Sequence, residues 1–307
     1  MNKYPIVWIT GACGFTGRHL IDFIRSNQHQ VYILAIDRFA ECSSDIDEYI
    51  QLDITNASAV LDLAKRCPPK KIFHLAGVLP PSDESIMWQV NVGGVYTLIN
   101  SLKQAKCEGV RLLSIGSAAE YFPNSSGFYT EDSEVGGNSS YGITKAAQSM
   151  LALSAGEKAG LDVIIARTFN LIGPGLSQNL VAGKICSQLF TGNINLTLGN
   201  IGAQRDFVDI RDAVKAYWNL MDSATANSVY NICSGIAVSI KELVLIASNV
   251  LNLDAVIEID KSLIRKYDFD CSYGNPQKIY QEIAWRSEIP IEISIKNMID
   301  ELGNTQF

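Results

Sequence analysis

The chain has 307 residues, 47% of them hydrophobic and 19% charged, and its formal net charge is −7 at pH 7. This length predicts two lobes or one large domain with an appendage, and the composition excludes disordered, collagen-like and disulfide-stapled proteins. An acidic chain without runs of like charge gives no reason to expect a nucleic-acid or membrane partner. The seven cysteines lack metal-binding spacing, and no apolar run is long enough to span a membrane. We therefore expect a metal-free cytoplasmic protein with reduced thiols.

The first half of the chain alternates short apolar runs with longer amphipathic segments, up to about residue 116 and again beyond it. Strands are predicted at residues 6–9, 31–36, 50–52, 71–75, 111–115 and 163–167. Helices are predicted between them at residues 17–27, 57–66, 87–105 and 142–159. This alternation predicts an α/β fold of the Rossmann type, a doubly wound parallel sheet with helices on both faces.

The second half has a different sequence pattern. Beyond residues 173–175, Gly, Asn and Pro are interleaved with short strand-like pieces, and amphipathic helices are predicted at residues 212–221 and 240–251. We expect a cofactor-binding domain over residues 1–170 and a smaller α/β substrate lobe over residues 171–307. A segment near residues 229–233 is expected to return to the first domain.

The turn after the first predicted strand is rich in glycine. Residues 10–17 read Thr-Gly-Ala-Cys-Gly-Phe-Thr-Gly and open the first predicted helix. Gly11 permits a tight turn, Gly14 lets the backbone approach a pyrophosphate, and Gly17 allows helix and sheet to pack closely. The helix start at Phe15 and Thr16 offers free N–H groups to the anion. The turn therefore predicts a dinucleotide-binding site.

The end of the second predicted strand supports the same site. Asp37 follows Gly17 by twenty residues, where a carboxylate can bind the hydroxyls of the adenosine ribose. This carboxylate repels a 2′-phosphate and favours NAD, whereas the neighbouring Arg38 can accept the phosphate of NADP. The cofactor is therefore NAD(P)H, with a slight preference for NAD.

A tyrosine and a lysine stand four residues apart at the head of a predicted helix. Tyr141 and Lys145 lie on one face of it, and a nearby ammonium favours the phenolate and so lowers the pKa of a tyrosine. Ser117 ends a predicted strand, where its hydroxyl can bind the same substrate oxygen. These three residues suit reversible proton transfer to a carbonyl group.

At this point the sequence resembles the extended short-chain dehydrogenase/reductases that act on nucleotide sugars. The resemblance rests on residues 10–17, 53–54, 74–77, 91–92, 117, 141–145 and 167–170 and covers nearly the whole chain. It implies a catalytic triad of Ser117, Tyr141 and Lys145. It also implies a cofactor site that includes Asp53, Ile54, Leu75, Ala76, Gly77 and Asn91.

The second half is most similar to the GDP-4-keto-6-deoxy-D-mannose reductases that form GDP-D-rhamnose. This likeness rests on residues 167–175, 204–212, 229–235, 264–268 and 274–278. It implies that Asn170, Arg205 and Arg265 bind the sugar and the diphosphate, with Lys184 near the base. Phe122 stands where the family usually has Gly, so the sugar and its stereochemistry at carbon 4 stay open.

The positions after the catalytic serine separate the reactions of this family. Dehydratases carry acidic residues there, and this chain has Ala118 and Ala119, so we expect a reductase of a nucleotide-linked 4-keto sugar. Glu120 is one residue too far along unless it swings in. A 4-epimerase with tightly bound NAD and a non-catalytic NAD(P) sensor remain as alternatives. Predicted helices 87–105 and 142–159 are apolar on more than one face, which favours a homodimer.

Overall fold

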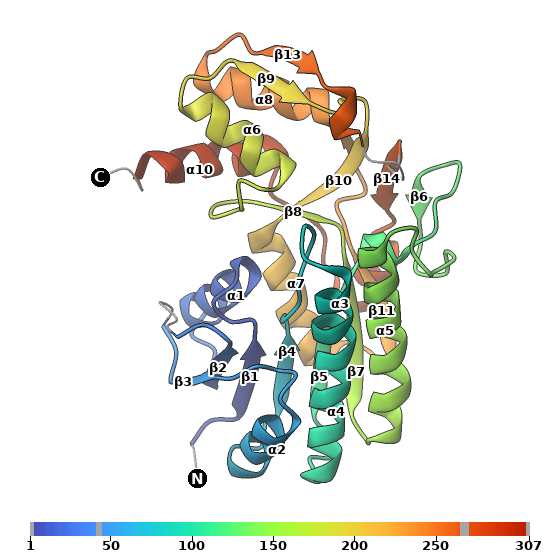
Figure 1. Ribbon diagram of the computed structural model, residues 1–307. Helices are drawn as coiled ribbons and strands as arrows, with labels where there is room; N and C mark the ends of the chain where they lie inside the picture. The colour runs from blue at the N-terminus through green and yellow to red at the C-terminus, as the bar shows by residue number, and fades with distance from the viewer. Residues whose placement is uncertain (1–2, 41–44, 265–269, 305–307) are drawn as a thin grey trace.

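The computed structural model describes residues 3–40, 45–264 and 270–304. A large sheet with helices on both faces fills the lower part of Figure 1, and a smaller layered region made mainly of later residues lies above it. The two parts are not consecutive in the sequence. Strand β11 (Ser228–Ile232) and helix α7 (Ile210–Ser223) belong to the lower part, although they come late in the chain.

The large sheet consists of seven parallel strands in the order β11-β7-β5-β4-β1-β2-β3. Its other strands are β1 (Ile6–Thr10), β2 (Tyr32–Asp37), β3 (Glu48–Gln51), β4 (Lys71–His74), β5 (Arg111–Ser117) and β7 (Asp162–Thr168). After β3 the chain crosses over β1 to form β4, so the winding direction reverses between β1 and β4. Ligands of such sheets bind beyond the carboxyl ends of the strands at this reversal. The predicted doubly wound parallel sheet is confirmed.

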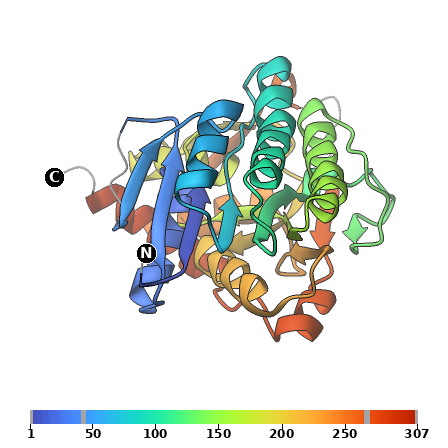
Figure 2. The same ribbon diagram turned by 90° about the horizontal axis from the view of Figure 1, so that it is seen from below.

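Both faces of the sheet are covered by helices (Figure 2). One face packs against α2 (Ala57–Arg66), α4 (Gly94–Gln104) and α5 (Ser140–Lys158), and the other against α1 (Phe15–Ser26), α7 and α9 (Gln277–Ile283). Each face of the sheet forms its own apolar core with the helices that cover it. Successive residues of a strand point to opposite faces, so Trp8 packs in the core of the first face and Val7 in that of the second. None of the helices in the described part of the chain is long and apolar enough to cross a bilayer.

The predicted helix at residues 87–105 is present, but it begins at Glu84, ends at Gln104 and contains a π-helical turn. The segment consists of α3 (Glu84–Met87), the π-helix η1 (Trp88–Gly93) and α4. A π-turn holds one more residue than an α-turn, and η1 carries Asn91, which is fully buried and bound to Val78 and Thr144. These long-range partners are not visible in the local apolar pattern.

In the described part of the chain, the upper region contains two sheets and three helices. The helices and most of these strands share one core, whereas Tyr129 of β6 belongs to a separate small cluster. One sheet has the order β12-β10-β14-β6, with β8 also paired to β10, and the other pairs β13 with β9. The strands are β6 (Phe128–Tyr129), β8 (Asn170–Ile172), β9 (Asn195–Leu198), β10 (Gln204–Asp209), β12 (Ala237–Ser239), β13 (Val256–Ile259) and β14 (Cys271–Gly274). The helices are α6 (Val181–Phe190), α8 (Ile240–Leu251) and α10 (Ile291–Asn304), and the short 3₁₀ turns of the chain are η2 (Ala118–Glu120) and η3 (Lys261–Leu263).

The sequence predicted only two helices after residue 175, and this is corrected by α6, α9 and α10. Helix α6 was missed because its sequence contains a glycine, which weakens a helix pattern. Gly183 is required there, since a Cβ would lie 2.9 Å from the carbonyl carbon of Ser177. The close approach of the preceding loop is a tertiary feature that a local pattern does not contain.

Candidate active site

The glycine-rich turn joins β1 to α1 beside the winding reversal. Gly11 has a φ of +71°, and a Cβ there would lie 2.8 Å from the amide nitrogen of Ala76. A Cβ on Gly17 would lie 2.5 Å from the carbonyl oxygen of Ala12, so this glycine is needed by the turn itself rather than by the sheet. Gly14 is the N-cap of α1, and no side chain of the described residues caps the helix. The first turn, with Phe15 and Thr16, therefore keeps N–H groups for an anion, which fits a pyrophosphate.

Asp37 lies next to this turn at the end of β2. Its carboxylate accepts hydrogen bonds from the backbone N–H of Cys13, at 3.0 Å, and from that of Arg38, at 2.7 Å. Asp37 is buried, whereas Arg38 is exposed and its guanidinium lies over the ring of Phe39. Both residues lie at the end of β2 beside the turn, the position at which the sequence predicts contacts with the adenosine ribose.

The expected adenine-binding pair lies after β3. Asp53 is exposed, and its Oδ1 accepts hydrogen bonds from the N–H and the hydroxyl of Thr55. Ile54 is buried, and a Cβ on Gly94 of α4 would lie 2.9 Å from its Cγ2. The pair is thus fixed by a turn on one side and by helix α4 on the other.

The segment after β4 completes this side of the site. The N–H groups of Leu75 and Ala76 donate to the carbonyl and the hydroxyl oxygen of Thr10, at 3.1 and 3.3 Å. A Cβ on Gly77 would lie 3.2 Å from Oδ1 of Asn91. The segment is therefore bound to β1 on one side and close to η1 on the other.

Asn91 connects three elements of the site. Its Oδ1 accepts from the N–H of Val78 at 2.9 Å, and its Nδ2 donates to the hydroxyl of Thr144 at 3.2 Å. Thr144 belongs to α5, the helix that carries Tyr141 and Lys145. Asn91 therefore fixes the loop after β4 relative to α5.

Ser117 and Tyr141 are brought together. Ser117 ends β5 and caps η2, and its hydroxyl accepts from the N–H of Ala119 at 3.2 Å. The side chain of Tyr141, in the first turn of α5, lies close to that of Ser117. Burial raises the pKa of Tyr141 to about 12, although the nearby hydroxyl of Ser117 acts to lower it.

Lys145 does not have the environment that the sequence predicted. Its ammonium donates to the carbonyl of Ile115 at 2.5 Å and to Oε1 of Gln148 at 2.6 Å. The expectation that it lowers the pKa of Tyr141 is therefore corrected, since the acceptors from β5 and α5 hold its charge and burial dominates the pKa of the phenol. Burial lowers the pKa of Lys145 itself to about 8, and the nearby Glu120 opposes this.

A buried ion pair lies beneath the triad. Oε1 of Glu120 accepts from the N–H of Ser117 at 2.7 Å and from the hydroxyl of Ser149 at 3.0 Å. Its Oε2 accepts from Nε of Arg167 at 2.9 Å, and both side chains of this pair are almost fully buried. Arg167 also donates to the hydroxyl of Tyr121. With both oxygens bound, Glu120 is not free to swing toward a substrate.

The predicted sugar-binding residues lie on paired strands. Ser117 is the register partner of Thr168 in β7, and β8, which starts at Asn170, follows directly. Asn170 is exposed and donates to the carbonyl of Asp206, and Arg205 lies beside it on β10, where its guanidinium donates to the carbonyl of Gln204 at 2.8 Å. Arg265 lies outside the described residues.

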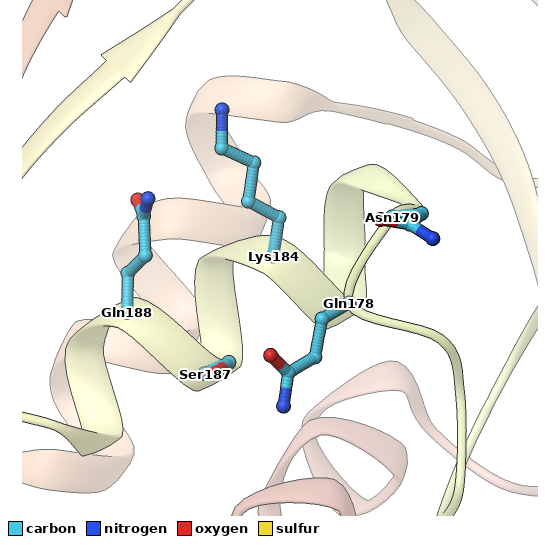
Figure 3. Close-up of a pocket in the computed structure, with 5 residues that line it drawn as sticks. All are labelled: Gln178, Asn179, Lys184, Ser187 and Gln188. Carbon is cyan, nitrogen blue, oxygen red and sulfur yellow. The ribbon is translucent and has the colours of Figure 1, made fainter. Parts of the chain in front are cut away.

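Lys184 lies on α6 in a separate hollow of about 450 Å³. Figure 3 shows Lys184 and Gln188 projecting from the same side of the helix, with Gln178 and Asn179 on the loop before it. The lining, which also includes Ser187, is entirely polar or charged. Such side chains suit hydrogen bonds to a polar ring or a hydroxyl-rich group.

Three residues with evident roles were missed or misread from the sequence. Glu120 was considered only as a mobile acid, Gln148 was not considered, and neither was Asp206. The carboxylate of Asp206 is fully buried and accepts N–H groups from Ser234, Gly235 and Gly274, so it joins β10 to two other segments. Most of their partners are distant in the sequence, and the available signal was a charged or polar residue inside an apolar segment.

The chain is similar to known proteins in both sequence and fold. Residues 7–233 match the NAD dependent epimerase/dehydratase family. A GDP-6-deoxy-D-mannose reductase of Pseudomonas aeruginosa is 26% identical to the chain, with 96% of each protein covered. A GDP-6-deoxy-D-talose 4-dehydrogenase of Aggregatibacter actinomycetemcomitans is 22% identical, with 89% of each covered.

Among solved structures, that of RMD from Pseudomonas aeruginosa complexed with NADPH is similar to this fold. Its TM-score is 0.83 at 25% identity, and the similarity covers 98% of this chain and 99% of the other. The predicted resemblance to the extended short-chain dehydrogenase/reductases, and with it the dependence on NAD(P), is confirmed.

Proposed function

The chain belongs to the NAD dependent epimerase/dehydratase family, and on this premise we propose that it reduces the 4-keto group of a nucleotide-linked 6-deoxyhexose. The enzyme is an NAD(P)-dependent extended short-chain dehydrogenase/reductase. The proposed substrate is GDP-4-keto-6-deoxy-D-mannose, because two relatives are named for oxidoreduction of GDP-6-deoxyhexoses.

The observation that carries the proposal is the triad without neighbouring acids. The side chains of Ser117 and Tyr141 lie close together, while the two positions after the serine carry only the methyl groups of Ala118 and Ala119. Elimination of water needs an acid and a base near the sugar, and a methyl group moves no proton. The bound state of Glu120 supports the same conclusion.

Each residue of the triad has a distinct task in this mechanism. When bound, the nicotinamide supplies hydride to carbon 4 of the sugar. Tyr141 gives its proton to the oxygen at carbon 4, and its pKa of about 12 keeps that proton available at neutral pH. Ser117 orients the same oxygen. Lys145, with a pKa of about 8, binds the nicotinamide ribose and returns a proton to the phenolate.

The cofactor is proposed to lie along the carboxyl ends of β1, β2 and β4. Gly11, Gly14 and Gly17 with the first turn of α1 hold the pyrophosphate, and the carboxylate of Asp37 binds the adenosine ribose. The position of this buried carboxylate beside the turn supports NAD over NADP. A kcat/KM with NADPH well above that with NADH would contradict this preference.

The nucleotide sugar is proposed to lie between the triad and the upper region. Asn170, Arg205 and Arg265 bind the sugar and the diphosphate, and Lys184 lies near the base. Under this division residues 1–170 serve mainly the cofactor and residues 171–307 mainly the substrate, with α7, β11 and α9 returning to the large sheet. A chain of net charge −7 needs such local cations to bind a diphosphate.

A homodimer is proposed through α4 and α5. Large apolar side chains on this side of the molecule are exposed, namely Trp88, Tyr96, Ile143 and Met150. Exposed apolar residues on neighbouring helices indicate a protein interface. Sedimentation velocity is expected to give the mass of two chains, and a species of one chain at micromolar concentration would contradict the proposal.

Replacement of the proposed acid tests the reaction directly. Tyr141→Phe is expected to lower kcat for the keto sugar by about 100-fold to 10,000-fold, the range for loss of a general acid. The affinity for NADH should change little, because the ring stays in place. The control is Tyr280→Phe, an exposed tyrosine on α9, which should leave kcat unchanged.

Near-normal turnover by Tyr141→Phe would contradict the mechanism. Purified protein that already contains NAD and interconverts two sugars without added cofactor would favour the 4-epimerase. Cofactor binding without turnover of any keto sugar would favour the sensor.

A further inference from the structure

Gln148 is a fully buried polar residue of α5, one turn beyond Lys145. Its Nε2 donates to the hydroxyl of Ser114 at 2.9 Å and to the carbonyl of Ile115 at 3.2 Å. Its Oε1 accepts from the ammonium of Lys145 at 2.6 Å. A backbone carbonyl only accepts hydrogen bonds, so Ile115 forces the NH₂ group of Gln148 toward β5 and its oxygen toward Lys145.

The same carbonyl group also binds Lys145, so Gln148 and Ile115 form two walls of a socket for the ammonium. An ammonium has three N–H donors, and this socket uses two of them. The third remains for a hydroxyl group of a ligand. Both acceptors are neutral, so the socket offsets part of the desolvation of Lys145 without forming an ion pair.

We propose that Gln148 is a positioning residue, which fixes the ammonium of Lys145 at the proposed ribose site and keeps it charged at neutral pH. This inference rests on the proposed role of Lys145 in binding the nicotinamide ribose. An apolar side chain at position 148 would leave a buried ammonium with one acceptor fewer. A carboxylate there would pair with it directly.

Few charges compete with this effect. Among the described residues, Glu120 faces Lys145 from η2, and Arg167 of β7 pairs with that carboxylate. His74 faces it from β4 and is neutral at physiological pH, because burial, with a contribution from Lys145, lowers its pKa to about 3. Tyr141 lies one turn earlier on α5 and stays protonated. Burial already lowers the pKa of Lys145 to about 8. The gain or loss of one hydrogen bond is therefore enough to change the fraction of Lys145 that is charged at physiological pH.

The test is the affinity for NADH as a function of pH, measured by nicotinamide fluorescence with no sugar present. For the unaltered protein the Kd is expected to rise with a midpoint near pH 8, where Lys145 loses its charge. Gln148→Met, of similar size, should move this midpoint down by about one unit, and Gln148→Glu should move it up by about one unit. Lys145→Met should remove the midpoint.

The control is Ser101→Ala, which removes another buried polar group on the same face of the sheet and should leave the midpoint unchanged. Thermal unfolding of each variant shows that it is folded. Midpoints of both Gln148 variants within about 0.3 unit of the unaltered protein would overturn the proposal. So would a midpoint that survives in Lys145→Met. Because no sugar is used, failure of the keto-sugar assignment leaves this result standing.

Discussion

The polar side chains around the proposed triad and the lysine proposed to lie near the base are held in opposite ways. Lys145 of the triad and the neighbouring Glu120, Gln148 and Arg167 are buried, and each makes at least two hydrogen bonds. In the upper region Lys184 reaches into a hollow of about 450 Å³ and is partly exposed. A buried, hydrogen-bonded set can hold reacting groups in place before a substrate arrives, whereas an exposed side chain can adapt to the ligand. We therefore propose that the core positions the reacting groups and that side chains nearer the surface recognise the sugar nucleotide.

The largest effect is expected where the buried network is broken. Arg167→Leu leaves the carboxylate of Glu120 without its cation at a site with almost no solvent, and loss of one partner of such a pair destabilises by about 3–5 kcal/mol. Urea unfolding should show this loss in the free energy of unfolding.

The matched control lies on the surface of the upper region. Lys296 pairs with Asp300 on α10, and both side chains are more than half exposed. Lys296→Ala should change the free energy of unfolding by less than about 0.5 kcal/mol. Similar losses in the two variants would remove the distinction between the buried and exposed sets.

A buried histidine on the same side of the molecule should also make the folding stability decrease at acidic pH. His74 has no solvent exposure, and its Nδ1 is hydrogen-bonded to the hydroxyl of Thr10. Its Nε2 has no hydrogen-bond partner among the described residues, and burial lowers the pKa of the imidazole to about 3. The unfolded chain, with a histidine pKa near 6.5, binds more protons between these values, so stability is lost as pH falls from about 6.5 toward 3. The slope is about 1.4 kcal/mol per pH unit for one proton.

His74→Asn removes the titrating group and can keep a hydrogen bond to Thr10. Urea unfolding at several values from about pH 7 to 4.5 should show the variant losing less stability than the unaltered protein on acidification. A stability difference that stays constant over this range would exclude His74 as a source of acid sensitivity.

A smaller effect, confined to substrate binding, is expected from Lys184. Lys184→Ala should raise KM for the GDP-sugar about tenfold, which is about 1.4 kcal/mol of binding, and leave kcat within about twofold. Steady-state kinetics at saturating cofactor separates the two constants. A large loss of kcat with unchanged KM would place Lys184 in the reaction rather than in recognition.

The sequence predicted the parts of the molecule that depend on neighbours in the chain. The turn at residues 10–17 and the buried strands were predictable, because a glycine pattern and a β-branched run are local signals. Asp37 and the triad followed from spacing and from the family resemblance, and the structure brings Ser117 and Tyr141 together.

The remaining features depend on contacts between distant segments. The spacing of Tyr141 and Lys145 placed both on one face of a helix but did not show that Ile115 and Gln148 hold the ammonium. The π-turn at Asn91 depends on Val78 and Thr144, which are distant in the sequence. Such partners are set by the fold, so local reasoning could name candidate residues but not the contacts that hold them.

The most direct test of the central claim follows the hydride. The protein is incubated with GDP-4-keto-6-deoxy-D-mannose and NADH that carries deuterium at the transferable position of carbon 4 of the nicotinamide, and the sugar product is examined by NMR. We predict one deuterium at carbon 4 of a GDP-6-deoxyhexose for each NADH oxidised. A new sugar without deuterium and without oxidised cofactor, or no product at all, would contradict the assignment.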